Sequence, residues 1–186
     1  MNAIFAAAVE VDEICRRNSF KYCFIGGLAV QRWGQPRMTA DVDLTVVTGF
    51  GGEEPFVDAL LGSLQPRISD ARGFALMHRT LLVRASNGVH ADISLGAMPF
   101  EERAAERATP YELGDGQRVL TCSAEDLIVH KAFAARDKDW LDIDGIVVRQ
   151  RGRLQLNQIW EELEPLLELK DDRVTASRLR ALFEAA

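Results

Sequence analysis

The sequence contains little cysteine, and its cysteines do not follow the spacing of a metal site. Cys15, Cys23 and Cys122 are scattered over 186 residues and form no C-x-x-C motif. An odd number of scattered cysteines argues against a zinc site and against a disulfide framework, and it favours a reducing compartment. We therefore expect free thiols and a cytoplasmic protein.

Long apolar runs are also missing. No stretch approaches the roughly 18 consecutive apolar residues that a membrane span requires. The first apolar stretch is short, is broken by Glu10, Asp12 and Glu13, and follows no basic segment. It therefore predicts an amphipathic first helix rather than a signal peptide, and we expect no membrane partner.

No strong excess of basic charge is present. The 22 Lys and Arg against 28 Asp and Glu give a formal net charge of −6, which argues against wholesale non-specific binding of nucleic acid. A local basic groove stays possible, because Arg149, Arg151 and Arg153 stand together. The content of 47% hydrophobic and 27% charged residues is ordinary for a globular protein. The length predicts one domain, or one domain with a small appended subdomain.

Several familiar signatures are absent as well. The sequence has no G-x-S-x-G elbow, no phosphate-binding loop with a lysine and no G-x-G-x-x-G. His78, His90 and His130 are isolated from one another and have no metal-ligand spacing. We expect these histidines to be structural, with His90 the only one of the three near a functional site.

The hydrophobic pattern predicts an α/β segment over 1–120 and a helical subdomain over 121–186. In the first segment we expect helices at 2–17, 28–33, 53–62 and 99–108, strands at 21–25 and 42–47, and two hairpins that turn at Asn87-Gly88 and Asp115-Gly116. In the second we expect a helix capped by Ser123, a helix from about 139, and two more at 157–169 and 173–185.

Two aspartates one residue apart introduce the first predicted strand, and a glycine pair precedes them. Alternate residues of a strand share one face, so Asp41 and Asp43 present neighbouring carboxylates. Joint ionisation of two such groups is costly unless a cation neutralises them, and Mg²⁺ prefers oxygen ligands. From the spacing alone, a turn-capping Asp41 and a solvent-exposed Asp43 explain the pattern as well.

Two chemistries use a D-x-D motif of this kind. In haloacid-dehalogenase-type phosphotransferases an apolar strand precedes the nucleophilic aspartate, whereas here the β-branched run "VDLTVV" follows Asp41. The second chemistry also uses Gly26 and Gly27, because a strand that ends in two glycines and opens a helix leaves backbone N–H groups free for phosphate. Two-metal nucleotidyl transfer then requires a third carboxylate. Asp92 is the candidate, since alternation in "GVHADISL" places it on one strand face with His90.

Together these motifs resemble the DNA-polymerase-β-type nucleotidyltransferase superfamily, and more closely its minimal, AbiEii-toxin-like branch. The stretches that carry the resemblance are 24–46, 89–95 and 123–153, the last with "SAEDLIVHKAFAARDKDWLDIDGIVVRQ". The resemblance implies an α/β (α+β) fold, with a mixed sheet flanked by helices and a C-terminal helical subdomain.

The resemblance also implies roles for individual residues. Gly26 and Gly27 would bind the triphosphate of an NTP, Asp41, Asp43 and Asp92 would hold two Mg²⁺ or Mn²⁺ ions, and Lys131 would contact the nucleotide. Asp92 would also be the base. Arg37 and Thr39, in the loop before Asp41, are further candidates for the nucleotide site, although Thr39 could brace the loop instead. Lys131 could equally pair with Asp139 or Asp142, within a salt-bridge network that includes Arg136 and Lys138.

The expected function is therefore transfer of NMP from an NTP to an acceptor. By resemblance, the acceptor would be an RNA end such as that of tRNA, or a protein hydroxyl, and the protein could be a toxin with a cognate antitoxin. One alternative is an inactive nucleotide-binding or protein-interaction module of the same fold. An aminoglycoside-type nucleotidyltransferase is a further alternative, and its acidic acceptor pocket would be compatible with the negative charge.

Overall fold

The computed structural model of the protein describes residues 2–185. Contacts divide the chain into two compact units. Among the described residues, the first consists of 2–28 and 38–122, and the second of 29–37 and 123–185. The segment 29–37 thus belongs to the helical unit, although it lies within the sequence of the α/β segment.

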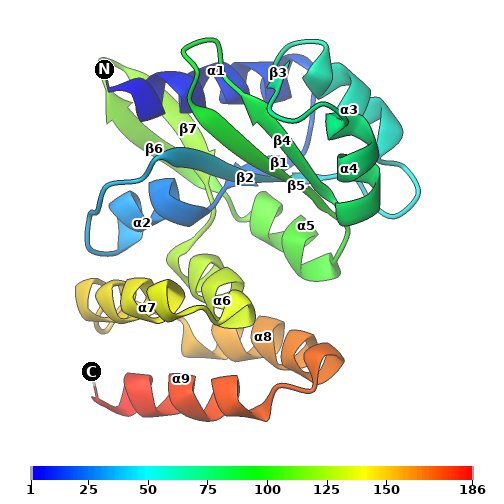
Figure 1. Ribbon diagram of the computed structural model, residues 1–186. Coiled ribbons are helices and arrows are strands. Elements are labelled where there is room, and N and C mark those ends of the chain that lie inside the picture. Colours follow the sequence, from blue (N-terminus) through cyan, green and yellow to red (C-terminus); the bar gives the residue numbers. More distant parts are fainter. Residues whose placement is uncertain (1, 186) are drawn as a thin grey trace. The chain divides into compact units, whose positions relative to one another are not determined.

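A mixed sheet organises the first unit, and within residues 2–185 it has seven strands in the order β3-β4-β5-β2-β1-β7-β6 (Figure 1). The strands are β1 (Tyr22–Phe24), β2 (Asp41–Val47), β3 (Gln65–Pro66), β4 (Thr80–Arg84), β5 (His90–Gly96), β6 (Thr109–Gly114) and β7 (Gln117–Thr121). The pairs β2–β5 and β1–β7 are parallel and the other neighbours are antiparallel. The expected mixed α/β fold is confirmed.

One face of this sheet forms the core with the helices α1 (Ala3–Arg17), α3 (Glu54–Leu61) and α4 (Ala71–His78). Alternate strand residues supply its apolar side chains, for example Val42 and Leu44 in β2, both fully buried. The opposite face carries α5 (Pro99–Glu106), which contacts β2 and β1 (Figure 1). The carboxylates of β2 and β5 therefore lie on the face away from the main core.

Both expected hairpins are present. Gly88 adopts a φ of +83° in the β4–β5 turn, and Asp115 and Gly116 adopt φ values of +54° and +73° in the β6–β7 turn. Two consecutive residues of positive φ are what a two-residue type I′ turn needs, and Asp-Gly provides them at low cost.

Two elements of the first unit were not predicted. The sequence between residues 62 and 79 forms the two-residue edge strand β3 and the helix α4. In α4, the carboxylate of Asp70 accepts a hydrogen bond from the backbone N–H of Gly73 at 2.9 Å. The helix is only eight residues long and contains a glycine, so its apolar periodicity is too short to stand out.

The second unit is helical, and its helices were predicted within a few residues. They are α6 (Ala124–Ala134), α7 (Asp137–Arg149), α8 (Leu156–Lys170) and α9 (Arg173–Ala185), together with the last five residues of α2 (Gly26–Trp33). Trp140, Ile143 and Val147 form the expected buried stripe of α7. No helix within residues 2–185 is long and apolar enough to cross a membrane.

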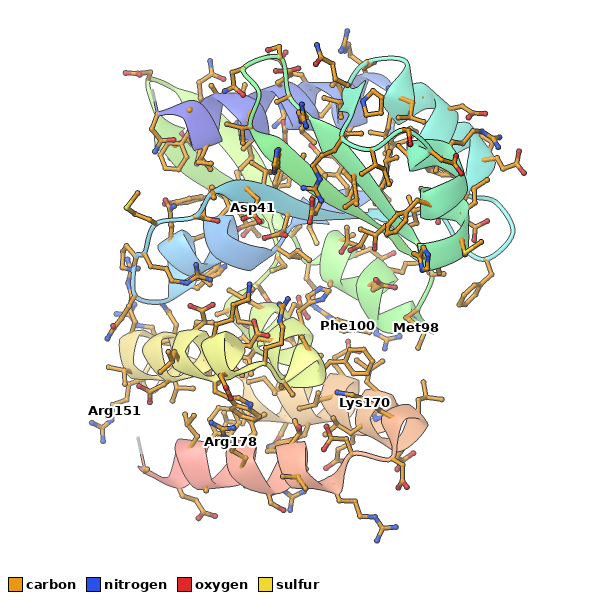
Figure 2. The ribbon with its side chains drawn as sticks, viewed as in Figure 1. Asp41, Met98, Phe100, Arg151, Lys170 and Arg178 are labelled. Carbon is orange, nitrogen blue, oxygen red and sulfur yellow. The ribbon has the colours of Figure 1, made fainter. Side chains whose placement is uncertain are left out.

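Backbone carbonyls of the segment 29–37 are bound by the end of α7. Arg149 donates from Nη1 to the carbonyl oxygens of Gln31 at 3.2 Å and Gly34 at 2.6 Å. The side-chain amide of Gln150 donates to the carbonyl of Trp33 at 2.8 Å. Arg149 therefore has a structural role, whereas Arg151 extends away from the helices (Figure 2).

We expect Ser123→Ala to destabilise the protein, because the Ser123 hydroxyl caps α6 by accepting a hydrogen bond from the Asp126 N–H at 3.0 Å. Loss of such a cap costs about 1 kcal/mol of unfolding free energy. Urea denaturation followed by circular dichroism measures it. Ser177→Ala, at an exposed position inside α9, is the control and should change stability by less than about 0.5 kcal/mol. Equal effects of the two substitutions would contradict the capping role.

Candidate active site

Three aspartates lie on the same face of the sheet, the face that also carries α5. Asp41 and Asp43 begin β2, and in the parallel β2–β5 ladder Asp43 lies directly opposite Asp92 while Asp41 lies opposite His90. Figure 2 shows Asp41 at the start of β2, on the side of the sheet away from α1. Because Val42 and Ala91 point into the core, the three carboxylates share the other face. The sequence predicted this face, and the register brings the third acid to the first two.

Gly26 lies against this carboxylate cluster. The chain leaves β1, the Ile25 N–H donates to the carbonyl of Asp43 at 2.9 Å, and α2 begins at once with Gly26 at a φ of +56°. A Cβ on Gly26 would lie 2.0 Å from Asp43 Oδ2 and 2.7 Å from Asp43 Cβ. Only glycine satisfies both the backbone conformation and the close approach of β2.

Thr39 connects the second glycine to the first aspartate. Its Oγ1 lies 3.0 Å from Asp41 Oδ1 and donates a hydrogen bond to it. A Cβ on Gly27 would lie 2.4 Å from the same Oγ1. Thr39 therefore orients Asp41, and it fits beside the backbone only because residue 27 is glycine.

Asp92 is paired with an arginine that the sequence pattern did not single out. Arg67 Nη1 lies 2.7 Å from Asp92 Oδ1. This oxygen is buried yet has no hydrogen bond of acceptable geometry, so the contact is an ion pair without good alignment. The sequence did not place Arg67 beside Asp92, because Arg67 lies in the segment whose strand and helix were not predicted.

The donor atoms on this face are of the kind that a hard divalent cation binds. They are carboxylate oxygens from two adjacent strands, one of them buried without a hydrogen bond, which are the ligands that Mg²⁺ prefers. As the side chains stand, no three His, Cys, Asp or Glu among residues 2–185 are gathered closely enough to hold a metal. Binding would therefore require adjustment of these side chains, and Arg67 is the cation now at Asp92.

Lys131 and Arg37 lie in the second unit and meet on one carboxylate. Lys131 Nζ, in a side chain that is almost fully buried, lies 2.7 Å from Asp142 Oδ2 and 3.4 Å from Asp139 Oδ1. Arg37 donates to both oxygens of Asp142, from Nε at 2.7 Å and Nη2 at 2.8 Å. Arg136 donates to Asp139 from Nε at 2.6 Å. The structure thus shows the salt-bridge network that was the alternative for Lys131.

This network lowers the pKa of both aspartates. Burial by itself raises the pKa of the Asp142 carboxyl, but hydrogen bonds from Arg37 and Lys131 outweigh it and bring the pKa below the ordinary 3.8. At Asp139 burial also raises the pKa, and Arg136 and Lys131 outweigh it. Both carboxylates are therefore ionised near neutral pH and contribute to the stability of the second unit.

No protein-family model and no curated protein matches the sequence significantly, but solved structures match the fold. A nucleotidyltransferase-like protein from Paracoccidioides brasiliensis has 17% sequence identity and a TM-score of 0.56, over 98% of this chain and 92% of its own. ANT(2")-Ia in complex with adenylyl-2"-tobramycin has 15% identity and a TM-score of 0.55, over 91% of this chain and 99% of its own. The chain therefore has a nucleotidyltransferase-like fold.

We expect Gly26→Ala to disturb the site by displacing Asp43. Gly51→Ala is the matched control, because Gly51 also has a positive φ, +77°, but a Cβ at this position would meet no atom within 4 Å. Both substitutions incur a backbone cost of about 1 kcal/mol. Steric overlap with Asp43 should add roughly 1–3 kcal/mol for Gly26→Ala alone. Thermal unfolding measures the difference, and equal destabilisation would contradict the close packing of Gly26 against β2.

We expect the stabilising effect of Asp142 to disappear in acid. Because its folded-state pKa is depressed, its contribution is present above the unfolded value of 3.8 and is lost as the pH falls through the folded value. The loss of unfolding free energy caused by Asp142→Asn should therefore shrink between pH 7 and pH 3. Urea denaturation across this range measures it. The exposed turn variant Asp115→Asn is the control, and a constant Asp142→Asn effect would contradict the assignment.

Proposed function

We propose that the protein is a metal-dependent nucleotidyltransferase, which transfers NMP from an NTP to an acceptor hydroxyl. The observation that carries the proposal is the β2–β5 register, which sets Asp43 opposite Asp92 on the face that also bears Asp41. The glycines at the start of α2 pack against these aspartates and their loop. The nucleotidyltransferase-like fold supports the same reaction.

The start of α2 is the proposed triphosphate site. The first N–H groups of a helix have no partner within it, and the helix dipole favours an anion there. Gly26 and Gly27 are the first two residues of α2 and have no side chains to keep a phosphate away. Thr39 holds Asp41 beside them through its 3.0 Å hydrogen bond.

Asp41, Asp43 and Asp92 are the proposed ligands of two Mg²⁺ or Mn²⁺ ions, which when bound neutralise phosphate charge and act as Lewis acids. In the reaction, the acceptor oxygen forms a bond to the α-phosphorus. The bond from the α-phosphorus to the bridging oxygen breaks, and pyrophosphate leaves with that oxygen. The carboxylate of Asp92 takes the proton of the acceptor hydroxyl. Asp41 and Asp43, both in β2, would hold the metal ions beside Asp92.

Arg37 and Lys131 stay predicted contacts of the nucleotide. Both side chains are engaged by Asp142, so a phosphate would have to replace this carboxylate as the partner of at least one of them. Phosphate and carboxylate present similar oxygen acceptors to a guanidinium or an ammonium group, which makes such an exchange chemically reasonable.

The acceptor that we favour is an RNA end, such as that of tRNA, or a protein hydroxyl, as the sequence resemblance implies. Arg151 and Arg153 are exposed and could serve a phosphate-bearing acceptor, whereas Arg149 is bound to backbone carbonyls. The toxin role and its antitoxin partner stay predictions from the sequence. An aminoglycoside is a second candidate acceptor, because a structural neighbour is described with adenylyl-2"-tobramycin.

We expect the purified protein to transfer label from one α-³²P-labelled NTP to total RNA, to host protein or to tobramycin, in the presence of Mg²⁺ or Mn²⁺. Asp43→Asn should reduce transfer by at least about 100-fold, because it removes a proposed ligand of the metal ions that would stabilise the developing negative charge. Asp115→Asn, the same chemical change in an exposed turn, should keep wild-type activity. The labelled product separates the three acceptor classes.

Three outcomes would contradict the proposal. Transfer that is equal in the wild type and in Asp43→Asn would place the chemistry elsewhere. Binding of NTP without transfer to any acceptor would favour the inactive nucleotide-binding module, and absence of both NTP and metal binding would favour a protein-interaction module.

A further inference from the structure

Arg67 occupies a fixed position beside the third carboxylate. It follows directly after the edge strand β3, and its backbone N–H donates to the carbonyl of Leu82 at 3.0 Å. Leu82 in turn faces Asp92 in the β4–β5 ladder. The backbone of Arg67 is therefore tied to the strand next to Asp92, and its side chain reaches the carboxylate from a defined position.

The geometry of the ion pair between Arg67 and Asp92 allows another cation to replace the guanidinium. The strongest arginine–carboxylate pairs make two parallel, well-aligned hydrogen bonds. Here Arg67 Nη1 lies 2.7 Å from Asp92 Oδ1, but the two groups are not aligned well enough to form a hydrogen bond. The two side chains are 21% and 33% exposed. Because the pair lacks an aligned hydrogen bond and both side chains are partly exposed, another cation that binds Oδ1 can take the place of the guanidinium.

Other carboxylates near Asp92 make a positive charge such as that of Arg67 favourable there. Asp43 lies directly across the ladder from Asp92, and like charges in such a position destabilise a sheet. Asp41 adds a third carboxylate to the same face. A positive charge at Asp92 relieves this repulsion when no divalent cation is bound.

We propose that Arg67 is a positioning residue that serves as the resident counter-ion of Asp92 and competes with the divalent cation for its carboxylate. The proposal rests on the proposed function, because it assumes that Asp92 is a metal ligand. Arg67 holds Asp92 in place in the metal-free protein, and it releases the carboxylate when the cation binds. It thereby sets the cation concentration at which the site fills.

The test is Mn²⁺ binding to the full chain without nucleotide, followed by the electron paramagnetic resonance signal of free Mn²⁺. Arg67→Gln should bind Mn²⁺ roughly three- to tenfold more tightly than the wild type, because a competing charge is removed. Arg67→Met keeps the aliphatic stem and should show the same tightening. Arg67→Lys retains the charge and should return the affinity toward that of the wild type.

Arg84→Gln is the matched control. Arg84 is exposed and lies on β4 opposite His90, two residues after Leu82, which faces Asp92. Its replacement by glutamine therefore removes one positive charge, as Arg67→Gln does, from the strand next to Asp92. The substitution should change the Mn²⁺ affinity by less than about twofold, since an exposed charge is screened by water and salt. Unfolding midpoints of all variants identify any that fail to fold.

The outcomes separate this inference from the proposed function. If Mn²⁺ binding depends on Asp43, tested with Asp43→Asn, but neither Arg67→Gln nor Arg67→Met tightens it beyond Arg84→Gln, then Arg67 is only a structural ion pair and the inference is overturned. If Mn²⁺ binding does not depend on Asp43, the metal site of the proposed function fails, and the role of Arg67 fails with it.

Discussion

The first unit has to accommodate an electrostatic repulsion, because the parallel strands β2 and β5 place two carboxylates side by side. Asp43 and Asp92 are neighbours in the β2–β5 ladder, and each lies between core residues whose burial fixes the register. A slip by one residue would turn every apolar side chain of β2 out of the core. The hydrophobic core thus holds the two carboxylates together against their mutual repulsion, and the repulsion makes the site selective for positive charge.

The surroundings of the carboxylates follow from this placement of like charges. Gly26 is required because β2 approaches the start of α2 so closely that a methyl group would overlap Asp43. Thr39 binds Asp41 from the preceding loop, and Arg67 balances Asp92 from the sheet edge. Backbone conformation, hydrogen bonding and charge each act on a different one of the three acids, which gives each acid its own environment although all three share one face.

Most of the fold could be predicted because its signals are local. Turn residues such as Asp115-Gly116, the cap at Ser123 and the stripe on α7 all specify structure within a few residues. The shared strand face of Asp41 and Asp43 could be predicted because strand alternation is local too. The partner of Asp92 could not, since Arg67 reaches it through an edge strand of two residues that has no periodicity of its own. The pairing of Lys131 with Asp139 and Asp142 was foreseen only as one of two alternatives, because spacing on helices allows a contact without requiring it.

The division of the chain has a consequence for how such a protein can be cut or recombined. The chain passes between the two units at three points, after Leu28, after Arg37 and after Cys122. A fragment that starts at Ser123 would lack the carbonyls that Arg149 binds and the guanidinium that shares Asp142 with Lys131. The helical unit is therefore not a transferable C-terminal module, and any exchange of this part between homologous proteins would have to carry the loop before Asp41 along with it.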